Sequence, residues 1–243
     1  MKLYAAATAA LGFFCLQNAN AGPADYLFTP TVEEGEKELE LRFGTADSDP
    51  RDSATSVALG YGINAWWFSE VAVQFERQGS ESVKYEALEW ENKFQITETG
   101  KYPVDVGFIT EIEIPKERAA EGIEVKIGPL FQTEFNKWQL NGNLLFERYY
   151  DGEEESNWDM GYQWQVKYRM QPSFEFGLQG FGEMGEWNDW EHSDEQSHKS
   201  GPAVFGKVPV GKHQSIAYNA AWLFGLSDGA QNNTFRMQVE YEF

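Results

Sequence analysis

The 243-residue chain has one cysteine, Cys15, and little positive charge. It carries 19 Lys and Arg against 39 Asp and Glu, which gives a net charge of −20 at pH 7. This balance argues against nucleic acid, which demands basic patches on its partners. It equally argues against electrostatic docking on an anionic lipid leaflet. We therefore expect no nucleic-acid partner.

Long hydrophobic runs are also missing, and the mean hydropathy is −0.54. The one apolar run, Tyr4 to Leu16, follows Met1-Lys2 and precedes the small-x-small sequence Ala19-Asn20-Ala21. This order predicts a signal peptide over residues 1–21, cleaved after Ala21, and one domain over residues 22–243. Cys15 lies in the predicted signal peptide, so the exported chain would have no disulfide or thiolate chemistry. No second run approaches the 18 or so residues of a transmembrane helix.

Apolar and polar residues instead alternate with period two, which is typical of β-strands. Trp158 to Met170 alternates without error, with Trp, Met, Tyr and Val on one face and Asp, Gly, Gln, Lys and Arg on the other. Val83 to Ile96 changes parity, which predicts a bulge near Glu86 to Leu88. We count twelve strands, with alternation over residues 38–43, 56–61, 67–76, 83–96, 104–114, 123–134, 138–147, 158–170, 174–178, 204–208, 216–224 and 234–243.

The connections between these strands alternate between short and long, as they do in outer-membrane barrels. Alternation alone does not say which face is wet, and a secreted two-sheet sandwich is the alternative. The apolar faces carry too much Trp, Tyr, Phe and Met to pack inside one barrel. Aromatic residues also gather near strand ends, as an interfacial girdle would: Trp66, Trp67, Trp138, Tyr149, Tyr150 and Trp158. We expect an all-β fold, a single transmembrane antiparallel up-and-down β-barrel of about 12 strands.

The last ten residues, Thr234 to Phe243, place Phe235, Met237, Val239, Tyr241 and Phe243 on one face. A final strand ending in Phe, with apolar residues two and four places earlier, resembles the assembly signal of bacterial outer-membrane barrels. The resemblance implies outer-membrane localisation and recognition of Phe243 by the barrel assembly machinery. Outer-membrane lipid and lipopolysaccharide would then be the surrounding partners.

Charged residues on the polar strand faces are the candidates for lining a pore. Carboxylates outnumber cations among them, which favours a narrow, cation-preferring lumen that passes cations or small molecules. The alternative is that these charges pair across strands and plug the barrel, since twelve strands lie between filled and open barrels. The candidate pore-lining residues are Arg42, Glu70, Glu111, Glu113, Lys126, Glu134, Glu147, Lys167, Arg169, Glu175, Glu183, Arg236 and Glu240.

The longest connection, Gly185–Lys199, contains two of the three histidines, His192 and His198. A metal site with nearby Asp and Glu, or a lid over the pore, competes there with a solvated acidic loop. We favour the solvated loop because no spacing matches a metal motif such as H-E-x-x-H. His213 falls in a short turn with no Ser-His-Asp arrangement, so we expect no enzyme activity, and we assign no metal or cofactor; a barrel hydrolase using this loop is the less favoured alternative.

Several short sequence segments, taken together, resemble the outer-membrane proteins of the MetA pathway of phenol degradation. They are Leu59-Gly-Tyr-Gly-Ile-Asn64, Glu89-Trp-Glu-Asn-Lys-Phe94, Ile112-Glu-Ile-Pro115, Leu140-Asn-Gly-Asn-Leu144, Gly201-Pro-Ala203 and Tyr241-Glu-Phe243. The chain departs from the family's Pro-x-Gly at Pro115-Lys-Glu-Arg118. The resemblance implies transport of small organic compounds across the outer membrane, and it carries over no catalytic residue.

Overall fold

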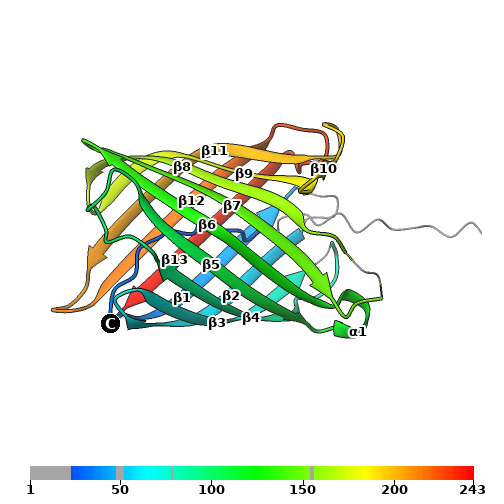
Figure 1. Ribbon diagram of the computed structural model, residues 1–243, viewed down its shortest axis with the longest axis horizontal. Coiled ribbons are helices and arrows are strands. Elements are labelled where there is room, and N and C mark those ends of the chain that lie inside the picture. The colour runs from blue at the N-terminus through cyan, green and yellow to red at the C-terminus, as the bar shows by residue number, and fades with distance from the viewer. Residues whose placement is uncertain (1–22, 48–51, 78, 154–155) are drawn as a thin grey trace, which may run out of the picture.

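The computed structural model describes residues 23–47, 52–77, 79–153 and 156–243, so the expected signal peptide lies outside the described residues. Nearly all of the regular structure is β-strand (Figure 1). Among the described residues, the one helix is the four-residue α1 (Arg118–Glu121), far too short to cross a bilayer. The strands are β1 (Lys37–Ala46), β2 (Asp52–Asn64), β3 (Trp67–Arg77), β4 (Lys84–Gln95), β5 (Asp105–Pro115), β6 (Ile123–Phe135), β7 (Trp138–Tyr150), β8 (Asp159–Gln171), β9 (Phe174–Glu186), β10 (Asp189–Trp190), β11 (Ser197–Pro209), β12 (Ser215–Gly225) and β13 (Asn233–Glu242).

Twelve of these strands close into an antiparallel barrel, which confirms the predicted fold class and strand number. Each strand pairs with its neighbours in sequence, and β13 pairs with β1 from Glu38↔Glu242 to Ala46↔Thr234. The short β10 stands apart from the wall and pairs only with the end of β9. Because every long strand has two partners, the wall has no open edge.

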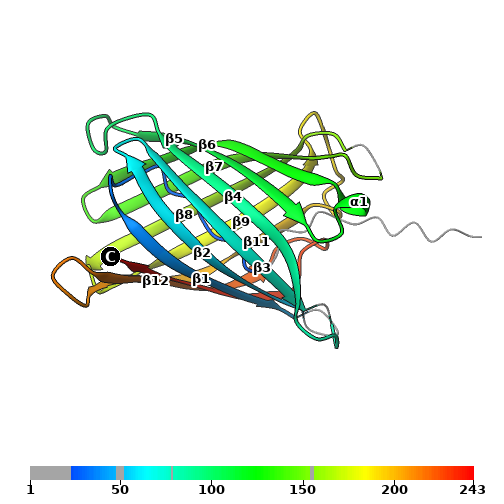
Figure 2. The same ribbon diagram turned by 90° about the horizontal axis from the view of Figure 1, so that it is seen from below.

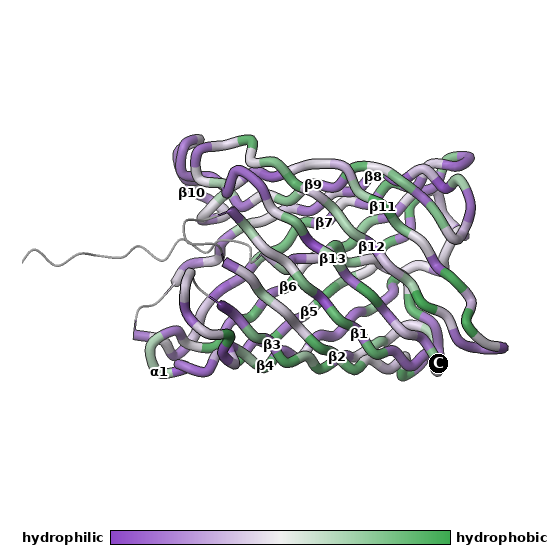
Figure 3. The backbone as a smooth tube through the Cα atoms, turned by 180° about the vertical axis from the view of Figure 1, so that it is seen from behind, coloured by the Kyte–Doolittle hydropathy of each residue, from purple (hydrophilic) through white to green (hydrophobic). Residues whose placement is uncertain are grey.

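The two faces of the wall differ as the alternation predicts. Trp90 exposes 47% of its surface to the outside, whereas its neighbour Glu91 exposes 4% and faces the lumen. Apolar residues recur along the strands, and the connections at both ends are mostly hydrophilic (Figure 3). The aromatic and aliphatic side chains thus form the barrel's outer surface, and the interior is lined by polar ones.

The parity change in β4 comes from a bulge at the predicted place. Val73 pairs with Leu88, but Phe75 pairs with Tyr85, so two residues of β4 stand opposite one residue of β3. The extra residue returns the apolar side chains to the outer face, as the sequence indicates.

The two ends of the barrel differ in their connections. One end, called here the turn end, has tight turns such as residues 65–66, 136–137 and 172–173. The other, called here the loop end, carries most of the longer connections, as well as α1 and β10, whereas the long connection 96–104 lies at the turn end (Figure 1). The predicted loop Gly185–Lys199 is shorter than expected, because β9 continues through Glu186 and β11 begins at Ser197. His198 and Lys199 are therefore wall residues.

Aromatic clusters lie on the outside near the strand ends. At the turn end Trp66, Trp67 and Phe94 stack on one another with ring centroids 6.1–6.3 Å apart. The sequence predicts that Tyr149 belongs to this girdle, but the structure places its side chain on the lumen side. Its hydroxyl donates to Glu124 Oε2 at 2.8 Å on the lumen side, because Tyr149 has the parity of the inward residues of β7.

Candidate functional site

The described residues before β1 enter the barrel. Residues 23–36, called here the N-terminal segment, run from the loop end toward the turn end between the strands (Figures 1 and 2). The backbone N–H of Phe28 donates to Gln163 Oε1 at 3.2 Å, and Asn143 Nδ2 donates to the Phe28 carbonyl at 2.9 Å. Closer to β1, the N–H of Val32 donates to Gln95 Oε1 at 2.7 Å. Side chains of the wall thus satisfy the segment's backbone groups in the interior.

Glycines in the wall make room for this segment. A Cβ on Gly44 would lie 1.7 Å from the carbonyl oxygen of Pro23. A Cβ on Gly107 would lie 2.8 Å from the Cα and Cβ of Pro30. Both glycines face the lumen, and no larger residue could occupy either position without moving the segment. The fit is therefore built into the sequence of the wall.

The segment divides the interior into two chambers that share Tyr26, Phe28 and Arg42 in their linings. These three residues are called here the septum. The guanidinium carbon of Arg42 lies 3.4 Å from the centre of the Tyr26 ring, a close cation–π contact. The Tyr26 hydroxyl in turn donates to Glu91 Oε2 on β4. Phe28 packs with Ile109, Leu130 and Leu145 in a small buried apolar cluster.

Arg42 is enclosed by four carboxylates from three strands. It pairs with Glu40 and Glu70, with Glu89 at 3.2 Å and with Glu91 at 3.9 Å. All five side chains are almost completely buried. A lone charge could not be buried at this depth, but a guanidinium has enough donors for several acceptors.

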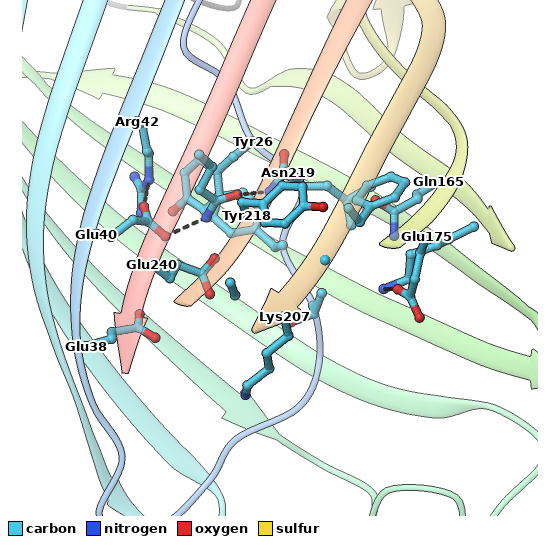
Figure 4. A pocket seen from close by; sticks show the side chains of 18 of the residues that line it. Tyr26, Glu38, Glu40, Arg42, Gln165, Glu175, Lys207, Tyr218, Asn219 and Glu240 are labelled. Carbon is cyan, nitrogen blue, oxygen red and sulfur yellow. Dashed lines mark hydrogen bonds and ion pairs between the residues drawn. The ribbon is translucent and has the colours of Figure 1, made fainter. Parts of the chain in front are cut away.

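The turn-side chamber has a volume of about 380 Å³ and nearly balanced charge. Six of its lining residues are glutamates and five are Lys or Arg. Figure 4 shows Arg42 and Glu40 on one side of this chamber, Gln165 and Glu175 on the other, and Tyr26 and Asn219 between them. Lys167 pairs with Glu175 at 3.1 Å on the far wall.

The loop-side chamber is larger, about 830 Å³, and strongly acidic. Twelve of its lining residues are Asp or Glu, whereas the Lys and Arg among the lining residues are Arg42 and Lys126. Lys126 Nζ lies 2.9 Å from Glu111, 3.1 Å from Glu124 and 3.9 Å from Glu147. Acidic side chains therefore greatly outnumber basic ones in the lining of this chamber.

The wall formed by β7, β8 and β9 is cross-linked by amides. Gln179 Nε2 donates to Gln165 Oε1 at 2.7 Å, and Gln165 Nε2 donates to Asn141 Oδ1 at 3.2 Å. Arg236 extends this belt by donating to Gln179 and Asn219, each at 2.7 Å. Hydrogen bonds among these buried polar side chains hold this part of the wall in place.

Most of the pore-lining candidates from the sequence do line the two chambers. Arg42 borders both. Glu111, Glu113, Lys126, Glu147 and Glu183 border the loop-side chamber. Glu70, Lys167, Arg169, Glu175 and Glu240 border the turn-side chamber. Arg236 is buried within the wall, and Glu134 lies at the turn-end rim, where it pairs with Arg169 at 2.5 Å.

Sequence reasoning overlooked other site residues. Glu89 and Glu91 alternate with the outward Leu88 and Trp90, so their inward position could have been read from the same pattern. Tyr26 and Phe28 gave no such signal. Their segment lacks period-two alternation, and only the three-dimensional fold places it in the lumen.

The three histidines do not converge. His198 is part of the wall, where its Nδ1 lies 3.0 Å from the Tyr162 hydroxyl and its Nε2 lies 2.9 Å from Gln196 Oε1. His192 is exposed in the loop after β10 and pairs with Asp194. The hydrogen bond that the imidazole donates to Asp194 raises the pKa of His192 above its ordinary value. His213 is exposed in the turn between β11 and β12.

Comparison with known proteins supports the fold. No family model and no curated protein matches the chain. Among solved structures, the COG4313 outer-membrane channel from Pseudomonas putida F1 is similar at TM-score 0.63 and 12% identity, over 90% of this chain and 98% of that one. The NanC porin is similar at TM-score 0.56 and 14% identity, over 84% of this chain and 100% of that one. The KdgM porin in complex with oligogalacturonate is similar at TM-score 0.56 and 9% identity, over 85% and 99%. The chain thus has the fold of bacterial outer-membrane β-barrels.

Proposed function

We propose that this chain is an outer-membrane channel that admits small, positively charged solutes. The observation that carries the proposal is the twelve-to-two excess of acidic over basic residues lining the loop-side chamber. A narrow cavity with walls of one sign concentrates ions of the opposite sign and repels ions of the same sign. The fold, similar to that of several porins, supports a channel role.

The two chambers suggest a route with distinct stages. A cation entering from the loop end meets the acidic chamber first, where attraction is strongest. It then reaches the septum, where Tyr26 and Arg42 contact each other between the two chambers. The turn-side chamber is nearly balanced in charge, so it would hold a cation less tightly and favour release. Conduction needs this combination of attraction at entry and weak binding at exit.

The resemblance to the MetA-pathway proteins bears on the size of the solute. It supports small organic molecules as the transported class, and the acidic chamber favours those that carry a positive charge. The apolar ring of Phe28 and the face of Tyr26 at the septum would tolerate the hydrocarbon part of such a solute. The proposal includes no covalent step.

Liposome swelling with the refolded barrel tests this function. Lysine, glutamine and glutamate have similar sizes and differ in charge, so they are matched solutes for the lumen. We expect swelling to be fastest with lysine and slowest with glutamate. Equal or faster swelling with glutamate would overturn a cation preference.

A second candidate, a barrel closed by its own segment and acting through its surface, is favoured by the septum itself. Tyr26, Phe28 and Arg42 fill the space between the chambers, and wall hydrogen bonds hold the segment at several points. A barrel that inserts in its heat-modifiable folded form but passes neither ions nor solutes would support this candidate and contradict the channel.

We also propose the location and the partners that such a barrel requires. The apolar outer face would contact outer-membrane lipid and lipopolysaccharide. The final strand β13 and Phe243 would be recognised by the barrel assembly machinery during insertion. Phe243 leaves 49% of its surface exposed, and its ring lies 5.5 Å from that of Tyr241.

A further inference from the structure

One part of the acidic wall has the form of a site for a single ion. Carboxylate oxygens of Glu89, Glu111 and Glu113 lie within 4.8 Å of one another. Glu89 and Glu113 are direct cross-strand partners on β4 and β5, and Glu111 follows on the same face of β5. Oxygens on opposite sides of one Ca²⁺ lie about 5 Å apart, because each is roughly 2.3–2.6 Å from the ion. The three oxygens therefore already have the spacing of one coordination shell.

A separate observation also points to a ligand there. Ser56 is 95% buried, and its hydroxyl has no hydrogen-bond partner among the described residues. Ser56 faces the loop-side chamber between Arg42 on β1 and Gln74 on β3, its cross-strand partners. Both partners bind Glu89, Arg42 at 3.2 Å and Gln74 at 2.7 Å, so the hydroxyl lies between the two residues whose side chains hold this carboxylate. A buried hydroxyl without a partner costs free energy unless a ligand uses it.

Gln74 completes the donor set. Its Nε2 donates to Glu89 at 2.7 Å and to Glu113 at 2.8 Å, and so holds two of the carboxylates together. A half-turn of the amide would present its carbonyl oxygen at the same place. The donors are then all oxygens from four adjacent strands, which hard divalent cations prefer over histidine or thiolate ligands.

The surrounding charges leave the site short of positive charge. Lys126 forms ion pairs with Glu111, Glu124 and Glu147. Arg42 forms ion pairs with Glu89 and three other glutamates. Within the described part of the chain, Glu113 forms no ion pair with a Lys or Arg, and its recorded contact is the Gln74 amide. We propose that Glu89, Glu111 and Glu113, with the Ser56 hydroxyl and the Gln74 carbonyl, bind one hard divalent cation of the Ca²⁺ type in the wall of the loop-side chamber.

This inference rests on the proposed function, because the bound ion belongs to the class of solute that the acidic chamber would admit. Binding nevertheless needs no passage through the septum, because all five residues line the loop-side chamber. Equilibrium binding and conductance therefore test different statements.

Calorimetric titration of the refolded full barrel with CaCl₂ tests the site, in detergent free of lipopolysaccharide and at about 0.15 M NaCl to screen diffuse attraction. We expect one saturable site per barrel. Glu113→Gln should weaken binding by at least about tenfold. The control Glu98→Gln, which changes an exposed turn-end carboxylate paired with Lys101, should leave it unchanged.

Ser56→Ala distinguishes a ligand from a merely structural residue. Removing an unpartnered hydroxyl should leave the thermal stability of the ion-free barrel unchanged or higher, while Ca²⁺ affinity falls. The absence of a saturable site, or equal affinity in wild type and Glu113→Gln, would overturn the inference. A barrel that binds one Ca²⁺ but never conducts would overturn the channel and keep the site, whereas a conducting barrel without saturable binding would do the reverse.

Discussion

Arg42 is the residue on which the interior depends most. It is the shared cation of Glu40, Glu70, Glu89 and Glu91, and it also stacks on Tyr26. This makes it both a structural counter-ion and part of the septum. A residue in two such roles cannot be exchanged for a neutral one without consequences for both.

Replacing Arg42 by Met should therefore destabilise the barrel by roughly 3–5 kcal/mol, because buried carboxylates lose their cation. Urea unfolding in lipid vesicles measures the loss. The double variant with Glu70→Gln should recover part of it, since one unpaired charge is then removed. Arg42→Lys keeps the charge, so its loss of unfolding free energy should be smaller. A loss below about 1 kcal/mol for Arg42→Met would contradict the pairing of Arg42 with the four glutamates.

The pKa of His192, which is exposed in the loop after β10, can also be predicted. Its hydrogen bond with Asp194 raises the pKa of the imidazole, so it should stay protonated to a higher pH than the ordinary value of about 6.5. The pair is complete below that value, and it is lost as the pH rises through the raised pKa. Following the imidazole proton by NMR should show the pKa returning toward its ordinary value in Asp194→Asn. An unchanged pKa in that variant would contradict the pairing.

At the scale of elements, the N-terminal segment is the feature that distinguishes this barrel from an open one. Removing residues 23–32 should join the two chambers and raise single-channel conductance. Stability should fall by up to several kcal/mol, because burial of Leu27 and Phe28 is lost and a buried side chain of this kind contributes about 1.5–3 kcal/mol. Unchanged conductance in the shortened chain would show that the segment does not limit passage.

Gly107 tests the same element without shortening the chain. A Leu side chain there would occupy the place of Pro30 and displace the segment. We expect Gly107→Leu to conduct more than wild type, with a barrel that remains heat-modifiable. Gly142→Leu is the matched control, because a Cβ at Gly142 meets nothing within 4 Å. Equal conductance in both variants would contradict the proposed fit of segment and wall.

The sequence pattern predicts some elements of this structure correctly and gives no information about others. Period-two alternation identified the twelve wall strands and even the β4 bulge, because the side-chain parity of a strand determines which face is wet. The same parity placed Glu111 and Glu113 in the lumen. It carried no information about residues 23–36, whose position depends on glycines and amides far away in sequence, such as Gly107 and Gln163. It also could not show that Glu134 lies at the rim beside Arg169.

At the scale of the whole molecule, charge is distributed unevenly along the barrel axis and around it. The loop-side chamber is strongly acidic, the turn-side chamber is nearly balanced, and an amide wall faces the carboxylates. In the channel that we propose, this polarity would attract cations at the loop end and release them at the turn end.

The reversal potential of single channels under a KCl gradient tests this account most directly. The account predicts a cation-selective potential for wild type and a shift toward zero for the combined variant Glu111→Gln, Glu113→Gln and Glu147→Gln. Glu134→Gln, which changes a rim carboxylate outside both chambers, should leave the potential close to wild type. An anion-selective or neutral potential in wild type would contradict the account.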